Sequence, residues 1–265
     1  MFLGDFHIHS TFSDGKHSVP ELIDAFGTRG FGVIAITDHL CESRTTLGKA
    51  AGFLGHTLTP ATFPLYKAIL RSEAERAWRE YQMVVIPGFE LTKNTLSNHR
   101  SAHLLALGVT EYLPADGDVK DLARQIRALG GVSVAAHPVW TGKLEKQTFH
   151  IWDRREELES ELDAWEVASG GLLFQKVAES HYRKIASSDL HSLKQISSWK
   201  TVFDCDRDPG AILDAIRSGK VRFAYYQDGE ELILDDGICD RTDDCCLGNG
   251  PGADFCRNMA VSKAV

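Results

Sequence analysis

Two short segments, one near each end of the chain, place metal-binding side chains two residues apart. They are His7-Ile8-His9 and Asp189-Leu190-His191. In extended backbone, residues i and i+2 project from the same face. Imidazole and carboxylate groups both bind divalent transition metals. Each segment therefore predicts a pair of metal ligands presented together at the end of a strand.

Further candidate ligands lie at the ends of other short apolar runs or within them. They are Asp38-His39 after Val33–Ile36, Glu90 after Val84–Ile86, His103 within Ala102–Leu107, and His137 after Val132–Ala136. Repeated placement of this kind is typical of a barrel whose functional groups gather at one rim. We therefore expect a multinuclear metal site at the carboxyl ends of the strands.

The elements that would position these side chains alternate between strands and helices. Strands are expected at Asp5–His9, Val33–Thr37, Met83–Glu90, Ala102–Val109, Val132–His137, Ala164–Ala168, Lys184–Asp189 and Lys200–Phe203. Helices are expected at Val19–Arg29, Phe63–Tyr81, Asp118–Leu129, Arg154–Leu162, Leu172–Arg183 and Pro209–Ser218. This alternation predicts an α/β fold with a parallel sheet, and the number of units favours a barrel. The long connection Cys41–Pro64 is either a lid beside the site or a surface insertion.

Composition narrows the class of protein. A chain of 265 residues with 43% hydrophobic content can bury a core without disulfides or structural metals. Its formal net charge of -8 disfavours an extended nucleic-acid footprint, which needs clustered Lys and Arg. No apolar run reaches the roughly 18 residues that span a bilayer, and the chain starts without a signal-peptide pattern. We therefore expect a cytoplasmic protein with no membrane partner; the sequence does not predict an oligomeric state.

Two parts are expected along the chain: a barrel domain over residues 1–227 and a polar tail over residues 228–265. Four of the six cysteines, Cys239, Cys245, Cys246 and Cys256, fall in the tail. They lack the CxxC pairs of a zinc ribbon. The Gly and Asp content of the tail instead predicts a flexible polar segment.

Read in order over residues 4–226, the motifs resemble those of the PHP (polymerase and histidinol phosphatase) family. The motifs are His7-x-His9, Thr11–Gly15, Thr37-Asp38-His39, Gly88-x-Glu90, Ala102-His103, Ala136-His137-Pro138 and Ser188-Asp189-x-His191. They look most like those of the small stand-alone members described as predicted metal-dependent phosphoesterases. The resemblance implies a distorted (β/α)7 TIM-like barrel with up to three metals at the carboxyl ends of its strands.

The resemblance also implies how the ligands would be shared. By position, the first metal would take His7, His9, Glu90 and Asp189. The second would share Glu90 and add His103 and His137, and the third would use Asp14, His39 and His191. His99 is an alternative to His103, but His103 adjoins the apolar run Leu104–Leu107 whereas His99 lies in a polar segment.

Together with this ligand set, the resemblance implies a hydrolase acting on phosphoric esters with two or three divalent metals. Imidazole and carboxylate without thiolate suit Zn, Mn or Fe. Such metals generate hydroxide at neutral pH for in-line attack on phosphorus. The substrate is expected to be a small phosphorylated metabolite or nucleotide. Asp38 is a candidate general acid, although an orienting role beside a ligand is the alternative.

Other residues are candidates for contact with substrate or for no special role. Lys200, Arg44, Trp140 and Lys143 are candidate substrate-binding residues, with a structural ion pair as the alternative for Lys200. His17, His56, His150 and His181 fit no motif and are interpreted as surface residues.

Three other functions stay open at this point. Histidinol-phosphate phosphatase and 3′–5′ exonuclease activities both occur in the family that the chain resembles. A non-catalytic PHP domain that binds metal without turnover is the alternative from a different class, and metal content would discriminate it from an enzyme.

Overall fold

The computed structural model describes residues 1–94, 100–139, 150–230 and 233–235. Its strands are β1 (Phe2–Asp5), β2 (Val33–Ile36), β3 (His39–Cys41), β4 (Val84–Lys93), β5 (Ala102–Leu107), β6 (Val132–Ala135), β7 (Ala164–Ser169), β8 (Leu172–Leu173), β9 (Lys184–Ser187), β10 (Ser198–Phe203), β11 (Val221–Tyr226) and β12 (Ile233–Asp235). Its helices are α1 (Val19–Gly27), α2 (Thr46–Phe53), α3 (Phe63–Tyr81), α4 (Val119–Ala128), α5 (His150–Asp153), α6 (Arg155–Leu158), α7 (Gln175–Ala178), α8 (Pro209–Ser218) and the 3-10 turn η2 (Leu193–Gln195).

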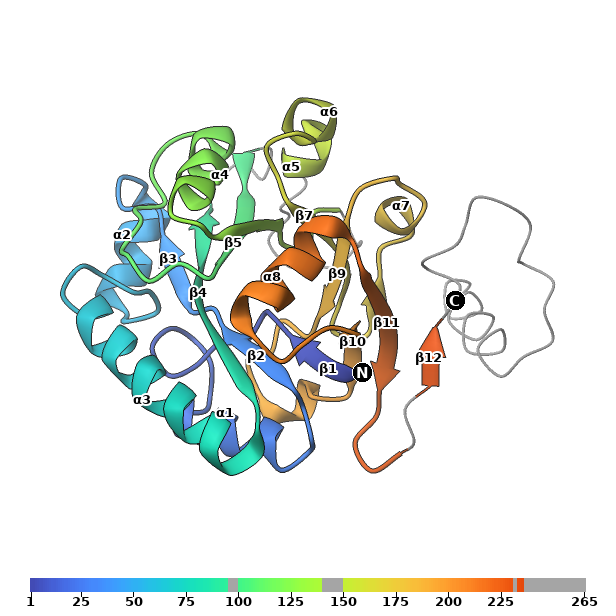
Figure 1. Cartoon of the computed structure of the whole chain (residues 1–265). Coiled ribbons are helices and arrows are strands. Elements are labelled where there is room, and N and C mark those ends of the chain that lie inside the picture. The colour runs from blue at the N-terminus through green and yellow to red at the C-terminus, as the bar shows by residue number, and fades with distance from the viewer. Residues whose placement is uncertain (95–99, 140–149, 231–232, 236–265) are drawn as a thin grey trace, which may run out of the picture.

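One curled sheet runs through the described part of the molecule, and helices lie around it (Figure 1). Its strand order is β12-β11-β10-β1-β2-β4-β5-β6-β7-β8, with β3 also paired to β4 and β9 to β7. The pairs β1–β2, β2–β4, β6–β7 and β7–β9 are parallel. The fold is therefore a mixed α/β fold rather than the wholly parallel sheet that alternation alone predicts.

The curl of the sheet brings the chain after β9 beside the chain after β1. Ile8 and Leu190 form an isolated parallel bridge. The backbone N–H of His9 donates to the carbonyl of Leu190 at 2.8 Å, and the N–H of Leu190 donates to the carbonyl of His7 at 3.0 Å. The two segments that carry candidate ligands lie far apart in the sequence and are held together by these backbone hydrogen bonds.

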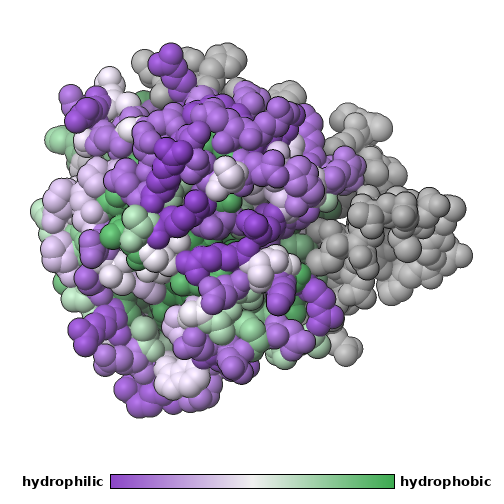
Figure 2. All heavy atoms as spheres, turned by 45° about the horizontal axis from the view of Figure 1, so that its top comes forward, coloured by the Kyte–Doolittle hydropathy of each residue, from purple (hydrophilic) through white to green (hydrophobic). Residues whose placement is uncertain are grey.

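The helices cover the sheet with apolar faces. In α1, the backbone N–H of Ser18 donates to the Glu21 carboxylate at 2.7 Å, which satisfies a donor at the start of the helix. Leu22, Ile23 and Phe26 are fully buried and join the single hydrophobic cluster of the described residues. The face shown in Figure 2 is mostly hydrophilic, with hydrophobic residues visible between the polar ones.

Several elements differ from the sequence-based expectation. β1 ends at Asp5, so His7 and His9 follow the strand instead of lying in it. The helix expected at Leu172–Arg183 is the short strand β8 followed by α7, because the Gly170-Gly171 pair turns the chain back into a hairpin with β7. The helix expected at Arg154–Leu162 is reduced to α6.

The strand expected at Lys200–Phe203 forms most of β10, but β11 and β12 were not predicted. β10 pairs antiparallel with β1 and with β11, and β12 extends the sheet beyond residue 227, where the tail was expected to begin. The cysteine-containing segment 236–265 lies outside the described residues. Among the described helices, none combines the length and apolarity needed to cross a bilayer.

Candidate metal centre

All nine predicted ligands converge on one end of the curled sheet. They form four overlapping groups whose ligand atoms lie within 4.8 Å of one another: His7 with His9 and Glu90; His7 with His137 and Asp189; Glu90 with His103 and His137; and His9 with Asp14, His39 and His191. His39 lies opposite Glu90 in the β3–β4 register. His103 lies at the start of β5, which runs antiparallel to β4, so the start of β5 meets the carboxyl-terminal half of β4.

Glu90 is the centre of the cluster. Its carboxylate oxygens lie 2.6 Å from His39 Nδ1, 2.7 Å from His103 Nδ1 and 3.5 Å from His7 Nε2. His137 Nε2 lies 3.6 Å from the same carboxylate. Glu90 is fully buried, so a single acid contacts ligands from four separate segments. This placement fits the bridging role that the family resemblance implies.

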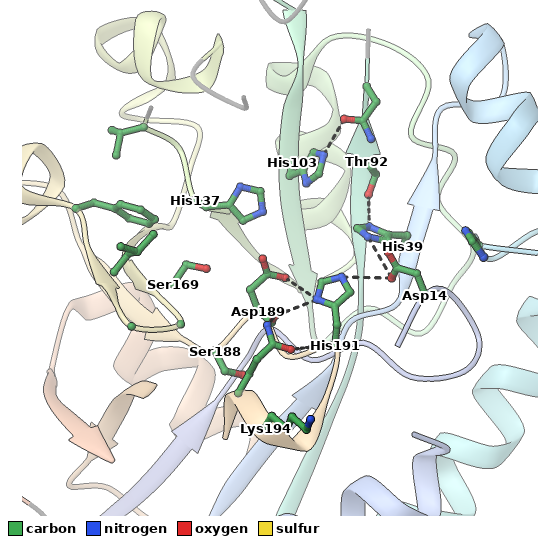
Figure 3. Close-up of a pocket in the computed structure, with 18 of the residues that line it drawn as sticks. Asp14, His39, Thr92, His103, His137, Ser169, Ser188, Asp189, His191 and Lys194 are labelled. Atoms are coloured by element: carbon green, nitrogen blue, oxygen red, sulfur yellow. Dashed lines mark hydrogen bonds and ion pairs between the residues drawn. The ribbon is translucent and has the colours of Figure 1, made fainter. Parts of the chain in front are cut away.

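Asp14 is the centre of the other half of the cluster. Its Oδ1 atom lies 3.4 Å from His191 Nε2, 3.5 Å from His39 Nε2 and 3.9 Å from His9 Nδ1. Figure 3 shows Asp14 between His39 and His191. The structure therefore adds His9 to the group expected to hold the third metal, and His9 links the two halves because it also lies 3.3 Å from Asp189.

Two residues outside the predicted set fix the orientation of ligands. Glu166 in β7 accepts a hydrogen bond from His7 Nδ1 at 3.0 Å and another from the backbone N–H of His137 at 2.7 Å. Thr92 Oγ1 lies 2.7 Å from His39 Nδ1. An acceptor on Nδ1 leaves Nε2 of His7 free to bind a metal, which is how carboxylates commonly hold metal-ligating histidines. The sequence signal for Glu166 is a lone acid inside the apolar strand Ala164–Ala168.

Asp38 organises the loop that carries Asp14. Its carboxylate accepts from the backbone N–H of Ser10 at 2.8 Å, from Ser10 Oγ at 2.6 Å and from Ser13 Oγ at 2.5 Å. Asp38 is fully buried and does not line the cavity. Burial raises its pKa, and the hydrogen bonds from Ser10 and Ser13 offset only part of that rise. The orienting role therefore fits Asp38 better than that of a general acid.

Two ligands have backbone conformations that non-glycine residues rarely adopt. His137 has a φ of 27° and Asp189 a φ of 51°. Positive φ brings Cβ close to the backbone and is uncommon outside glycine. Outliers of this kind cluster at functional sites because the surrounding structure has to hold them in place.

Charges within the cluster shift the pKa of its members in opposite directions. Burial alone would lower the pKa of His7, but Asp189, Glu166 and Glu90 hold it well above the usual value. The pKa values of His39, His137 and His191 are also raised, since nearby carboxylates outweigh the effect of burial. Burial and the charge of His39 lower the pKa of His9 to about 3. The pKa values of Glu90 and Asp189 are lowered because neighbouring imidazoles outweigh their burial.

The buried polar atoms of the cluster fit divalent metal ions. Six of them make no hydrogen bond with the described residues: Nε2 of His7, both ring nitrogens of His9, both carboxylate oxygens of Glu90, and Nδ1 of His103. Buried polar atoms without partners are rare and costly. Metal bonds of about 2.0–2.2 Å would hold such ligand atoms about 3–4 Å apart and would supply the missing partners. The residues present therefore suit a multinuclear site.

Comparison with solved structures shows that the fold of this chain resembles a known fold. The structure of a two-domain protein from Bacteroides vulgatus ATCC 8482, which contains a predicted PHP-like metal-dependent phosphoesterase, superposes with a TM-score of 0.64 at 21% sequence identity. The match covers 85% of this chain and 65% of the Bacteroides chain. The chain has a PHP-like fold. The likeness confirms the expected α/β fold, whereas the (β/α)7 barrel that the motifs imply stays a prediction.

A further solved structure matches the chain with a lower TM-score, and the comparisons of sequence found no match. An amidohydrolase from Chromobacterium violaceum, solved with bound sulfate and no metal, matches 86% of this chain and 99% of its own at 17% identity, with a TM-score of 0.49. No protein-family model matches the chain, and no curated protein is significantly similar to it.

In this PHP-like fold the candidate ligands line an open cavity of about 820 Å³ (Figure 3). Asp14, His39, His103, His137, Asp189 and His191 contribute to its wall. His56 and Cys41 also line it. His56 is exposed, as expected for a surface residue, but its position at this cavity was not predicted. His181 is exposed and pairs with Glu159, whereas His17 and His150 are half-buried.

The candidate substrate-binding residues lie elsewhere or outside the described residues. Lys200 is fully buried, pairs with Asp5 at 2.6 Å and donates to Ser198 Oγ at 2.6 Å, so it has the structural ion-pair role and does not line the cavity. Arg44 is exposed but does not line the cavity either. Trp140 and Lys143 lie outside the described residues, as does His99.

Proposed function

We propose that the protein is a metal-dependent phosphoesterase that hydrolyses small phosphorylated molecules at a trinuclear centre formed by the nine converging ligands. The observation that carries this proposal is the set of buried ligand atoms around Glu90 and His9 that make no hydrogen bond with the described residues. In the same proposal, the curled sheet is a distorted (β/α)7 barrel that the Ile8–Leu190 bridge joins at its seam.

The openness of the site supports an enzyme over a purely structural metal centre. Structural sites are closed by protein ligands, whereas catalytic sites keep a position open for water or substrate. Six of the ligands line a cavity large enough for a small molecule. Divalent metals bound there would act as Lewis acids that lower the pKa of coordinated water and offset charge on a phosphoryl group.

The residues of this chain would contribute orientation. Glu166 holds the imidazole of His7 with Nε2 toward Glu90 and Asp189. Asp38 holds the loop that presents Asp14. Because phosphoryl transfer depends mainly on positioning and electrostatics, these fixed ligands would supply most of what the reaction needs from the protein.

Metal content and activity on the same preparation test this proposal. We expect two or three equivalents of Zn, Mn or Fe in the full chain, measured by mass spectrometry. Hydrolysis of a phosphomonoester and phosphodiester panel should increase when the chelated protein is reloaded. His7→Ala and Asp189→Ala should each lower turnover more than about a hundredfold, beyond the range seen for residues that only support a ligand.

A matched control is His181→Ala, which removes an exposed imidazole paired with Glu159. This variant should retain both metal and activity. Less than one equivalent of metal, together with no gain of activity on adding Mn or Zn, would overturn the proposal.

A further inference from the structure

The wall of the cavity has two chemically different sides. One side holds the metal ligands. The other is uncharged and comes from the β7–β8 hairpin, the residue Phe174 that follows it, and Tyr225 in β11. We call it the hairpin wall, and it comprises Ser169, Gly170, Gly171, Leu172, Phe174 and Tyr225. Figure 3 shows Ser169 on the side of the cavity away from Asp14.

The hairpin wall is fixed by contacts behind it. The backbone N–H of Trp199 donates to the carbonyl of Gly170 at 3.0 Å, and the N–H of Phe174 donates to the carbonyl of Val167 at 2.8 Å. The ring of Tyr225 meets that of Trp199 edge-on, with centroids 5.7 Å apart. A wall held in this way offers a pre-formed apolar and aromatic surface.

Lys194 is the one Lys or Arg among the described residues that line the cavity. It is exposed, and no carboxylate of the described residues forms an ion pair with it. The nearby cation Lys93 is already paired with Glu42 at 2.7 Å, and Lys200 is buried against Asp5. Lys194 lies in η2, three residues after His191, and lines the same cavity as His191 and Ser188 (Figure 3).

We propose that Lys194 binds the phosphoryl group of the substrate while the hairpin wall receives an apolar or flat leaving alcohol. The substrate would then be the phosphate ester of a small organic alcohol. This inference rests on the proposed function and narrows its substrate class. A single free ammonium suits one phosphoryl group, whereas a polynucleotide needs a series of cations along its backbone.

Gly171 is a position of the hairpin wall at which a larger side chain would reduce the space for a leaving group. Its φ is not in the left-handed region, and a Cβ built there would have Tyr225 Oη as its nearest neighbour at 3.9 Å. A larger side chain at this position would therefore extend into the cavity without backbone strain. It should exclude bulky leaving groups and tolerate small ones.

The first experiment replaces the charge of Lys194 in the full, Mn-loaded chain. Lys194→Met should raise KM for phenyl phosphate about ten- to hundredfold with little change in kcat, as expected for loss of a charge-assisted hydrogen bond made throughout the reaction. Lys194→Arg should restore most of the affinity. The control Lys220→Met removes an exposed lysine that does not line the cavity.

Titration calorimetry with inorganic phosphate gives a readout that needs no turnover. The Kd of phosphate for Mn-loaded Lys194→Met should rise by a factor similar to the rise in KM. If Lys194→Met leaves both phosphate affinity and KM within about twofold of the parent chain, the role of Lys194 is overturned. A parent chain without turnover would refute the proposed function, and the phosphate titration would still decide the role of Lys194.

The second experiment compares leaving groups. Gly171→Val should lower kcat/KM for phenyl phosphate at least about tenfold while leaving methyl phosphate nearly unchanged. Calorimetry with inorganic phosphate should show unchanged affinity. An equal loss for both esters would overturn the assignment of the hairpin wall to the leaving group.

Discussion

At the scale of single residues, the candidate ligands depend on neighbours outside the nine converging side chains. Glu166 is fully buried and contacts both the ring of His7 and the backbone of His137. One carboxylate thus supports two candidate ligands that lie far apart in the sequence.

Removing the charge of Glu166 should weaken metal binding without unfolding the protein. We expect Glu166→Gln to lower metal affinity about ten- to hundredfold, because the Nδ1–H of His7 loses an anionic acceptor and the imidazole becomes a poorer donor to metal. Competition with a chromogenic chelator measures the affinity, and circular dichroism monitors the fold. Glu159→Gln, at an exposed carboxylate, is the control; an equal effect in both variants would contradict the assignment.

The residue types and their place at the ends of apolar runs were enough to predict which side chains converge. Glu166 was not predicted because an acid inside a strand is also typical of a surface position. Its burial depends on β6 and β9, which flank β7 on either side. Likewise, Lys200 was a candidate substrate-binding residue with a structural ion pair as the alternative, and the pairing of β1 with β10 buries it against Asp5.

At the scale of elements, the loop from Ser10 to Lys16 positions one half of the site. The N–H of Gly15 donates to the carbonyl of Ser10 at 3.0 Å, and the N–H of Lys16 donates to the carbonyl of His191 at 2.9 Å. A Cβ on Gly15 would lie 2.1 Å from the carbonyl oxygen of His9. The close approach of the two backbone segments therefore requires glycine.

Gly15→Ala should release this loop and with it Asp14. We expect the loss of about one metal equivalent while the ligands around Glu90 keep theirs, measured by mass spectrometry after dialysis. Gly52→Ala in α2, where the nearest atom to a new Cβ is 4.0 Å away, is the control. If Gly15→Ala retains its full metal content, the loop accommodates the added Cβ without displacing Asp14, and the prediction is wrong.

The order of the elements was largely predictable, but strand direction was not. Hydrophobic runs located β2, β4, β5 and β6 within a few residues. Direction depends on how connections cross the sheet, and the 94–101 connection is too short for a helical crossover, so β5 returns antiparallel to β4. The position of His103 among the other ligands follows from that reversal.

At the scale of the whole molecule, the clustered charges couple stability to pH when metal is removed. Above pH 6.5, unfolded histidines are neutral, and so are His9 and His103, whose pKa values are lowered in the fold. His7, His39, His137 and His191 have raised pKa values and still hold protons there. The folded state then binds more protons than the unfolded state. The stability that these four protonated histidines contribute is therefore lost as pH rises through their raised pKa values.

We therefore expect metal-free protein to melt at a lower temperature at pH 8.5 than at pH 6.5. Metal-loaded protein should show the opposite trend, because protons compete with metals for the same imidazoles. Thermal melts of both forms in matched buffers check this. A melting temperature of metal-free protein that increases over this range would contradict the assignment of raised pKa values.

The positive φ values of His137 and Asp189 favour glycine, whereas a role as metal ligand needs the imidazole or carboxylate side chain. Glycine would relax each position by about 1–2 kcal/mol, yet it would remove a ligand. Selection for stability alone would therefore drive these two positions toward glycine. Under the proposed function, a histidine and an aspartate at these two positions give up backbone stability for two side chains that bind metal.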